Sequence, residues 1–222
     1  MNTRIKKIAR FSAVSLLLLA ILLAAMLPVT NAQAKAKTNR QDFHDGMRKL
    51  WEDHITWTRL VIIGVFEELP DLNPSVQRLL QNQVDIGNAV KPFYGEAAGD
   101  QLTALLTDHI LIAAEILQAA KNGDTAALED ASERWYANAD DIAAFLNAAN
   151  PDHWPFEEMQ MMMREHLDPT LEEAVAYLNG DYEASIAAYD RIHLQALEMA
   201  DMLSDGIIQQ FPHRFQGGES SH

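Results

Sequence analysis

The sequence predicts an all-α protein, an antiparallel bundle of six to seven helices built on duplicated αα-hairpins. Apolar residues recur at spacings of three and four over long stretches, which places them on one face of a helix. Proline and glycine stand at the ends of these stretches, where helices start and stop. No segment shows the sustained apolar–polar alternation that is typical of strands. Because the predicted connections are short, neighbouring helices should be antiparallel.

The first two helices are bounded by prolines. The spacing predicts a first helix over about 42–69, ended by Pro70. Asn73-Pro74 then supplies an N-cap followed by proline at the first helical position. The second helix runs from there to about Val90 and should end before Pro92, since proline lacks an amide donor.

Glycine and asparagine bound the next two helices. Gly95 precedes a third helix of about 26 residues, which Asn122-Gly123 closes. Asp124 is the expected N-cap of the fourth helix, and Asn150-Pro151 ends it.

The predicted number of helices, six or seven, depends on whether Pro169 divides the fifth segment. A fifth segment opens at Pro155 and contains Pro169, where we expect a kink or a restart. Asn179-Gly180 ends that segment, and the last helix covers about 181–210.

The N-terminal residues have the features of a secretory signal. Residues 1–34 contain four basic and no acidic residues, a continuous apolar run over 16–29, and Ala32-Gln33-Ala34, which predicts cleavage after Ala34. The alternative is an uncleaved membrane anchor, because residues 11–29 approach the ~20 residues that span a bilayer. Either interpretation places the folded part outside the cytoplasmic membrane, secreted or in the cell envelope.

We divide the remaining chain into three parts. Residues 35–41 are predicted to be a flexible lead-in, residues 42–215 a single helical-bundle domain, and residues 216–222 a disordered Gly/Ser-rich tail.

Composition excludes several classes of partner and chemistry. Removal of residues 1–34 leaves 13 basic against 32 acidic residues, a net charge of −19 with neutral histidine. So acidic a chain disfavours nucleic acid and anionic membranes, which leaves membrane contact to the N-terminal segment if it is uncleaved. The chain contains no cysteine, so it has no disulfides, no thiol catalysis and no thiolate metal ligands. A protein or small-ligand partner stays open.

Polar residues recur within the apolar stripes of the predicted helices. Histidine occupies such positions on four helices and asparagine on two others: His54, His109, His166, His193, Asn82 and Asn138. Buried polar groups are costly unless they are paired, so these side chains should meet partners in the core.

Part of this pattern is an internal repeat. The segment 82–87, Asn-Gln-Val-Asp-Ile-Gly, matches 138–143, Asn-Ala-Asp-Asp-Ile-Ala, at an offset of 56, and Asp-His-Ile recurs over 53–55 and 108–110 at an offset of 55. Residues 42–92 and 97–151 therefore form two predicted copies of an αα-hairpin. The third stretch follows in part, through Glu165-His166 and a looser match at 204–207.

The first hypothesis for the polar array is a divalent transition-metal site inside the bundle. Imidazole and carboxylate suit zinc, iron or copper, and the proposed ligands are His54, His109, His166, His193, Asp85 and Asp141. Asn82, Asn138, Thr58 and Arg59 would orient them as a second layer of contacts. The predicted helices contain no His-x-x-x-His pair and no Glu-x-x-His pair of the di-iron type.

Two other interpretations remain open. In the second, each histidine is a satisfied core residue of a structural or partner-binding bundle. In the third, buried histidine and aspartate act as the acid and base of an enzyme. We favour a non-enzymatic protein over the third interpretation.

Four segments carry a resemblance to a known family. They are Leu50–Arg59 (LWEDHITWTR), Asn88–Gly95 (NAVKPFYG), Trp135–Ile142 (WYANADDI) and Ser204–Ile208 (SDGII). The mature chain resembles a family of exported helical proteins found in Bacillus-type bacteria. The resemblance implies export and carries over no activity and no functional residue.

Overall fold

The computed structural model describes residues 37–216. The predicted signal over 1–34 and residues 217–222 of the predicted tail lie outside these residues. Gln216, the first residue of that tail, is instead ordered and pairs with Asn39. The described part contains six long helices, one 3-10 turn and a two-stranded pairing. Their bounds are β1 (Thr38–Asn39), α2 (Arg40–Glu67), α3 (Leu72–Tyr94), α4 (Glu96–Asn122), α5 (Thr125–Ala149), α6 (Phe156–Leu178), α7 (Tyr182–Gln210), η2 (Pro212–Arg214) and β2 (Phe215–Gln216).

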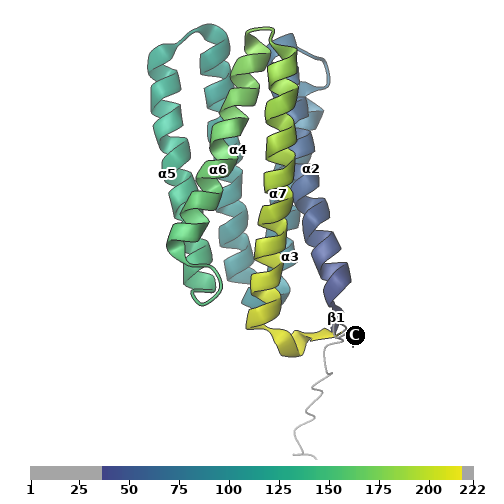
Figure 1. The fold of residues 1–222 in the computed structure, drawn as a ribbon. Helices are drawn as coiled ribbons and strands as arrows, with labels where there is room; N and C mark the ends of the chain where they lie inside the picture. Colours follow the sequence, from purple (N-terminus) through teal and green to yellow (C-terminus); the bar gives the residue numbers. More distant parts are fainter. Residues whose placement is uncertain (1–36, 217–222) are drawn as a thin grey trace, which may run out of the picture. The chain divides into compact units, whose positions relative to one another are not determined.

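The predicted all-α antiparallel bundle is confirmed, with six helices (Figure 1). The predicted cap at Asp124 is confirmed, since its carboxylate accepts from the amide of Ala127. Asp181 caps α7 in the same way, through the amide of Ala184. The predicted stops at Gly123 and Gly180 have positive φ, the conformation that closes a helix at glycine.

The structure corrects two predictions about proline. Pro92 lies inside α3, which continues to Tyr94, and α6 runs through Pro169 without the predicted restart. The alternative of a kink at Pro169 stays a prediction. A proline removes one amide donor and crowds the preceding turn. Buried residues flank Pro169 on the same helix, with Leu167 and Thr170 both in the core, and this packing holds the helix through that cost.

Regular structure begins within the predicted flexible lead-in, residues 35–41, earlier than the predicted helix start at residue 42. Asn39 is the N-cap of α2, because its side-chain oxygen accepts from the amides of Gln41 and Asp42. Thr38 and Asn39 pair in parallel with Phe215 and Gln216 in β2. A pairing of two residues per strand has no period that sequence patterns can reveal.

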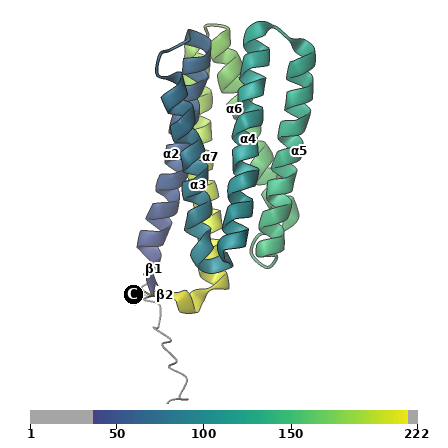
Figure 2. The same ribbon diagram turned by 180° about the vertical axis from the view of Figure 1, so that it is seen from behind.

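The helices form a ring in chain order, and alternate helices meet inside it (Figures 1 and 2). Each of α3, α5 and α7 packs between two neighbours, whereas α2, α4 and α6 also contact one another. Successive helices are antiparallel, so these three inner helices run in the same direction. Within the described residues α4 is long and apolar enough to cross a membrane. Part of its apolar surface is buried in the core, including Leu106 and Ile116, whereas Leu111 is exposed.

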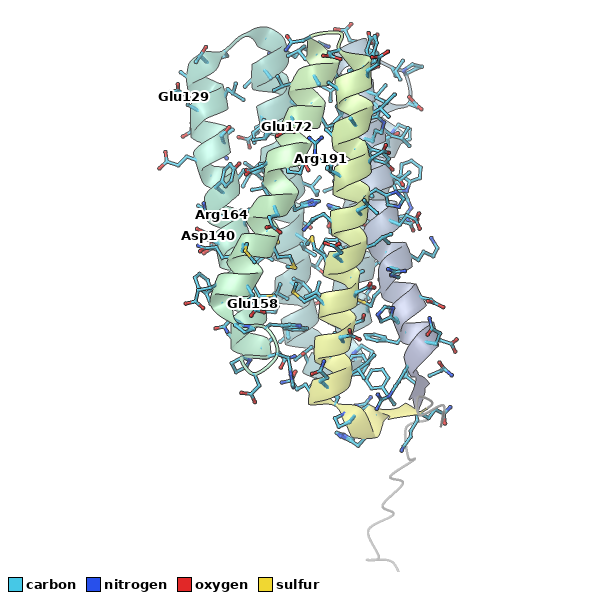
Figure 3. The ribbon with its side chains drawn as sticks, viewed as in Figure 1. Glu129, Asp140, Glu158, Arg164, Glu172 and Arg191 are labelled. Atoms are coloured by element: carbon cyan, nitrogen blue, oxygen red, sulfur yellow. The ribbon has the colours of Figure 1, made fainter. Side chains whose placement is uncertain are left out.

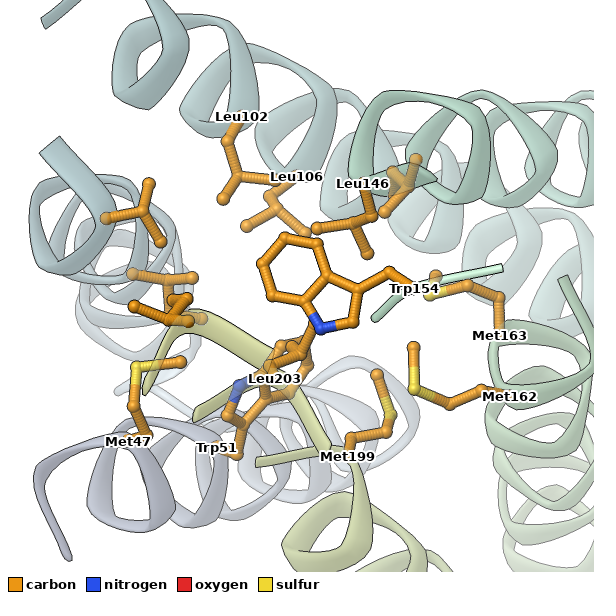
Figure 4. A pocket seen from close by; sticks show the side chains of 14 residues that line it. Met47, Trp51, Leu102, Leu106, Leu146, Trp154, Met162, Met163, Met199 and Leu203 are labelled. Atoms are coloured by element: carbon orange, nitrogen blue, oxygen red, sulfur yellow. The ribbon is translucent and has the colours of Figure 1, made fainter. Parts of the chain in front are cut away.

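The centre of the core is apolar and almost filled. Trp154, from the connection between α5 and α6, projects among side chains of the inner helices and α7 (Figure 4). A cavity of about 20 Å³ remains there, lined by Trp51, Leu106, Met162 and Met163 among others. The methionines are thus core-filling residues, consistent with their flexible side chains.

Helices α3 and α4 approach closely where two glycines meet. A Cβ on Gly87 would lie 2.6 Å from the carbonyl oxygen of Gly99 and 1.9 Å from Oγ1 of Thr103. A side chain at Gly87 would therefore push the two helices apart, because the backbone oxygen of Gly99 cannot move independently of α4. The absence of a side chain at Gly87 thus allows their close spacing.

Replacing Gly87 by alanine should therefore lower the free energy of unfolding by ~1–3 kcal/mol, the usual cost of overpacking. Gly46→Ala in α2 is the matched control. A Cβ there meets nothing within 4 Å, so the change should stabilise the helix by up to ~1 kcal/mol. Urea unfolding followed by circular dichroism measures both; equal effects would contradict the proposed close packing.

Ion pairs join the outer faces of neighbouring helices. Figure 3 shows Arg164 of α6 beside Asp140 of α5, and Arg191 of α7 beside Glu172 of α6. Exposed pairs of this kind contribute little stability. The bundle is therefore held mainly by its core, and buried polar groups matter more than surface charge.

Candidate functional site

Three of the four predicted histidines come together in one layer of the core. His54, His109 and His166 belong to α2, α4 and α6, the three inner helices, and are 4%, 3% and 5% exposed. The ring centres of His54 and His166 are 5.8 Å apart. His109 stacks on Trp135 of α5, with 5.0 Å between ring centres.

The Nδ1 atom of each histidine faces an amide side chain on the next helix. The distances are 3.2 Å from His54 to Gln83 Nε2, 2.7 Å from His109 to Asn138 Oδ1, and 3.1 Å from His166 to Gln195 Oε1. Each partner lies 29 positions after its histidine. A histidine–amide contact therefore occurs once in each helix hairpin, but its direction differs. The oxygens of Asn138 and Gln195 accept from Nδ1, whereas Gln83 Nε2 donates to Nδ1 of His54.

A second hydrogen bond holds an amide of each outer helix in place. Asn82 Nδ2 donates to the carbonyl of Leu50 at 2.9 Å, and Asn138 Nδ2 donates to that of Leu105 at 3.1 Å. In the third hairpin, Gln195 Nε2 donates to the carbonyl of Met162 at 3.0 Å. Each acceptor lies four residues before the histidine of its hairpin.

These amide bonds fix the protonation of the rings. The side-chain nitrogens of Asn138 and Gln195 donate to backbone carbonyls. Their amide oxygens therefore face the histidines and accept from Nδ1–H. His109 and His166 are then protonated on Nδ1, and each carries its lone pair on Nε2. That nitrogen lies on the side of the ring away from the outer helix.

Burial keeps all three rings neutral. Loss of water around the charged form lowers the pKa of His54 to about 3, and nearby His166 and His109 lower it further. Burial and the neighbouring His166 likewise lower the pKa of His109 to about 3. Burial lowers the pKa of His166 to about 4, against the opposing effect of Gln195.

Polar atoms without a partner gather at this layer. Among the described residues, four buried side-chain nitrogen or oxygen atoms make no hydrogen bond. Three lie at the layer, Trp51 Nε1, Gln83 Oε1 and His109 Nε2, and the fourth is His193 Nε2 on α7. Trp51 packs against His54, with ring centres 5.6 Å apart, and Gln83 contacts the same ring. Unsatisfied buried groups are rare in folded proteins and require an explanation.

Two small cavities lie on either side of the histidine layer. The apolar cavity of Figure 4 is lined by residues one turn before the histidines, such as Trp51 and Leu106. A second cavity, of about 30 Å³, is lined by Thr58, Ala113 and Thr170, each four residues after a histidine. Both are far smaller than the ~300 Å³ or more of an ordinary small-molecule pocket.

The structure does not bring His193, Asp85 and Asp141 to this layer. His193 is on α7 with its side chain 36% exposed, and its Nε2 lies 3.3 Å from Glu52. Asp85 accepts from Gln81 and pairs with Arg78 on the outer surface of α3. Asp141 is exposed on α5.

The predicted supporting residues divide in the same way. Asn82 and Asn138 belong to the layer, as expected. The hydroxyl of Thr58 donates to the carbonyl of His54 at 2.8 Å, so it does not orient a ring. Arg59 instead donates to Glu173 at 2.6 Å, and its guanidinium lies 5.0 Å from the centre of the Tyr189 ring.

Glu173 is a buried acid that the sequence analysis did not single out. Its side chain is 2% exposed, and burial raises its pKa to about 7 although Arg59 opposes the shift. Gln83 and Gln195 were also missed, but their signal was present: each stands 29 residues after a stripe histidine, as Asn138 does.

Within residues 37–216 no group of three or more histidine or acidic side chains is arranged to hold a metal ion as it stands. The layer therefore consists of three buried, neutral imidazoles. Amide side chains of the outer helices contact their Nδ1 atoms, and the layer contains hydrogen-bond donors and acceptors that have no partner. Comparison with protein-family models, curated proteins and solved structures finds no match for this chain.

Proposed function

We propose that this chain is an exported, non-enzymatic binding protein of the cell envelope, and that the layer of His54, His109 and His166 holds a small ligand. The observation that carries this proposal is the gathering of buried atoms without partners at the layer. A group that filled their hydrogen-bonding or coordination capacity would remove the cost of leaving them unpaired.

The same burial argues against catalysis at these residues. An acid and a base that act on a substrate need a path to it, and the three rings are 5% exposed or less. The small cavities limit a ligand in this layer to an ion or to a few heavy atoms. The acidic charge of the chain also favours a cation over an anion or nucleic acid.

The sequence of residues 1–34 supports export, through its basic start, its apolar run and the Ala32-Gln33-Ala34 site. We expect the protein recovered from cells to begin at Lys35 and to be found outside the cytoplasmic membrane. N-terminal sequencing of the exported protein tests this. An intact Met1 in the membrane fraction would identify an anchor instead of a cleaved signal.

We also infer that the three hairpins are copies of one unit. The supporting observation is the identical spacing of 29 residues from histidine to amide in all three. In the third unit the counterpart of Asn138 is Gln195, whereas the sequence match at 204–207 pointed further along α7.

Native mass spectrometry of the untagged exported protein, purified without chelator, tests the binding function. We expect an added mass that disappears on denaturation. His54→Gln in the layer should lose it, whereas the matched variant His193→Gln on α7 should keep it. A bare mass for the unmodified protein would overturn the proposal.

A bare protein would support a second candidate, a structural or partner-binding bundle with a largely satisfied polar core. The observation that favours this candidate is that every Nδ1 of the layer already contacts an amide of the next helix.

A further inference from the structure

We infer that the base of the bundle binds an anionic membrane phospholipid, with its acyl chain in an apolar groove between α2 and α3 and its phosphate near Lys37, Arg40 and Arg214. The base is the end of the bundle at which β1 pairs with β2 and α2 begins (Figure 1). This site is separate from the histidine layer, so the inference goes beyond the proposed function.

The groove has the size and the lining of a site for an apolar ligand. Its volume is about 470 Å³, which is within the ~300–1,000 Å³ of ordinary small-molecule sites. Thr38 and Asp42 are its polar lining residues, whereas the others, such as Phe43, Met47 and Phe93, are apolar. A hydrocarbon chain is stabilised by such a lining, because both surfaces leave water when they meet.

A glycine keeps the groove open on the side of α2. Gly46 lines the groove, and a Cβ at this position would meet nothing within 4 Å. Glycine inside a helix costs stability relative to alanine, and no neighbouring atom of the bundle requires it here. An acyl chain that lies against this part of α2 would fill the open space.

The base also carries the basic side chains that lack an acidic partner. Among residues 37–216, lysines and arginines pair with carboxylates within 4 Å, except Lys37, Arg40 and Arg214. Lys37 is next to Thr38 of the groove, and Arg40 is the first residue of α2. The guanidinium of Arg214 lies 5.7 Å from the centre of the Phe93 ring, which lines the groove. An anionic head group beside the groove would therefore meet unpaired positive charge.

Aromatic contacts connect these basic residues to the groove. The ring of Phe215 lies 5.3 Å from the rings of both Phe43 and Phe93, measured between ring centres. Phe215 directly follows Arg214 and pairs with Thr38 in β1. The proposed contacts to the acyl chain and to the head group thus belong to one packed part of the protein.

The course of the chain brings the base to a membrane. Residues 11–29 are apolar over a length that approaches a bilayer span. Seven residues, 30–36, separate this stretch from Lys37, and seven residues extend at most ~25 Å. While the stretch is in the membrane, as a signal during export or as an anchor, the base is the end of the bundle nearest to lipid. The position of the groove therefore favours lipid as its occupant.

The acidic charge of the whole chain does not prevent this contact. The 28 residues of α2 extend about 42 Å, whereas charges in physiological salt are screened over ~8 Å. Acidic residues on distant parts of the bundle therefore act weakly at the base. Asp201, which lines the same surface cleft as Arg40, pairs with Arg48. Asp42 repels a phosphate beside it, so the head group should lie on the side of Lys37 and Arg214.

A second surface groove, between α4 and α5, provides a comparison. Its volume is about 610 Å³, and Leu105, Ala144 and Phe145 are among its lining residues. The charged residue of its lining is an acid, Asp141, and no lysine or arginine lines it. This groove is larger than the groove at the base but lacks positive charge, so we expect it to bind no anionic lipid.

Photochemical cross-linking tests the site. Phosphatidylcholine vesicles contain phosphatidylglycerol with a photoreactive group on its acyl chain. The exported protein is mixed with the vesicles, or reconstituted into them if it retains an anchor, and irradiated. Peptide mass spectrometry should find cross-links on residues 38–50 and 89–93, and none on residues 98–105 and 141–149 of the second groove. The absence of cross-links from 38–50 and 89–93 would overturn the inference.

Matched variants test the contact with the acyl chain. Gly46→Leu fills the groove at the base, whereas Ala144→Leu adds the same side chain type to the second groove. Both positions are exposed, so both variants should fold, which circular dichroism checks. Gly46→Leu should lose the cross-links and Ala144→Leu should keep them. Equal cross-linking of the two variants would contradict the proposed site.

A second pair of variants tests the contact with the head group. Replacing Lys37, Arg40 and Arg214 together by glutamine should weaken binding of phosphatidylglycerol about 100-fold, since each basic residue near an anionic surface strengthens binding about fivefold. The same replacement of Lys49, Arg134 and Arg191, which are paired with acids, should change binding little. A phosphatidylcholine probe with the same photoreactive chain should cross-link poorly to the unmodified protein. Equal yields from the two probes would overturn the inference.

Discussion

Acidification from pH 7 to pH 4 is expected to destabilise the bundle steeply. The three core histidines have pKa values of about 3, 3 and 4 in the folded state, against ~6.5 when unfolded. Because the pKa of each histidine is lower in the folded state, the unfolded chain binds more protons than the folded chain in this pH range. The stability from the neutral rings is therefore complete above pH ~6.5 and decreases as the pH falls toward the folded values.

The expected slope is large. Each histidine contributes ~1.4 kcal/mol per pH unit below its unfolded pKa, or about 4 kcal/mol per unit for the three. Glu173 acts in the opposite direction, because its folded pKa is raised to about 7. Its protonation stabilises the folded state as the pH falls from 7 toward ~4.5. This effect cancels about one third of the pH dependence that the three histidines produce.

Urea unfolding in metal-free buffer between pH 7.5 and 4.5 measures this dependence. His193→Gln is the control variant, because this side chain lies outside the layer on α7. An unfolding free energy that is flat from pH 7 to 5 would contradict neutral buried histidines.

The sequence predicted the histidine layer better than it predicted the surroundings of that layer. His54, His109 and His166 stand on inner helices whose apolar stripes are long and regular, so their burial could be read from spacing. His193 followed the same spacing but belongs to an outer helix, and there a shift of one position, ~100° around the axis, separates exposed from buried. Its neighbour Ile192 occupies the buried position.

The acidic residues show what spacing along one helix cannot determine. Asp85 lies three residues after Asn82, which predicted a shared face. The asparagine reaches inward to the carbonyl of Leu50, whereas Asp85 lies at the edge of that face and pairs with Arg78. Which edge faces solvent depends on where neighbouring helices pack, and the sequence of a single helix does not contain that information.

Loss of Arg59 is expected to be among the most destabilising single changes in the chain at pH 8. Its guanidinium donates to Glu173 at 2.6 Å, lies 3.4 Å from the hydroxyl of Ser185, and packs over Tyr189. Glu173 and Ser185 are almost fully buried. Arg59→Met would leave an unpaired carboxylate in the core, and breaking a buried pair in this way costs ~3–5 kcal/mol.

The cost of Arg59→Met should decrease as the pH falls. Without the guanidinium the pKa of Glu173 rises further above its unfolded value, so the folded variant gains stability from protonation below that pKa. The variant should therefore lose stability relative to the parent at pH 8 and recover part of it at pH 6. This trend is opposite in sign to the histidine effect, which both proteins share.

Two further variants separate the buried charge from the loss of packing. Arg59→Met combined with Glu173→Leu removes both charges and should recover most of the lost stability, because well-packed apolar pairs replace buried ion pairs at little cost. Arg191→Met, which removes the exposed pair with Glu172 between α6 and α7, should change stability only slightly. The four proteins are compared by urea unfolding at pH 8 and pH 6. If the double variant were as unstable as Arg59→Met, the loss would come from packing around Arg59 and not from the carboxylate of Glu173.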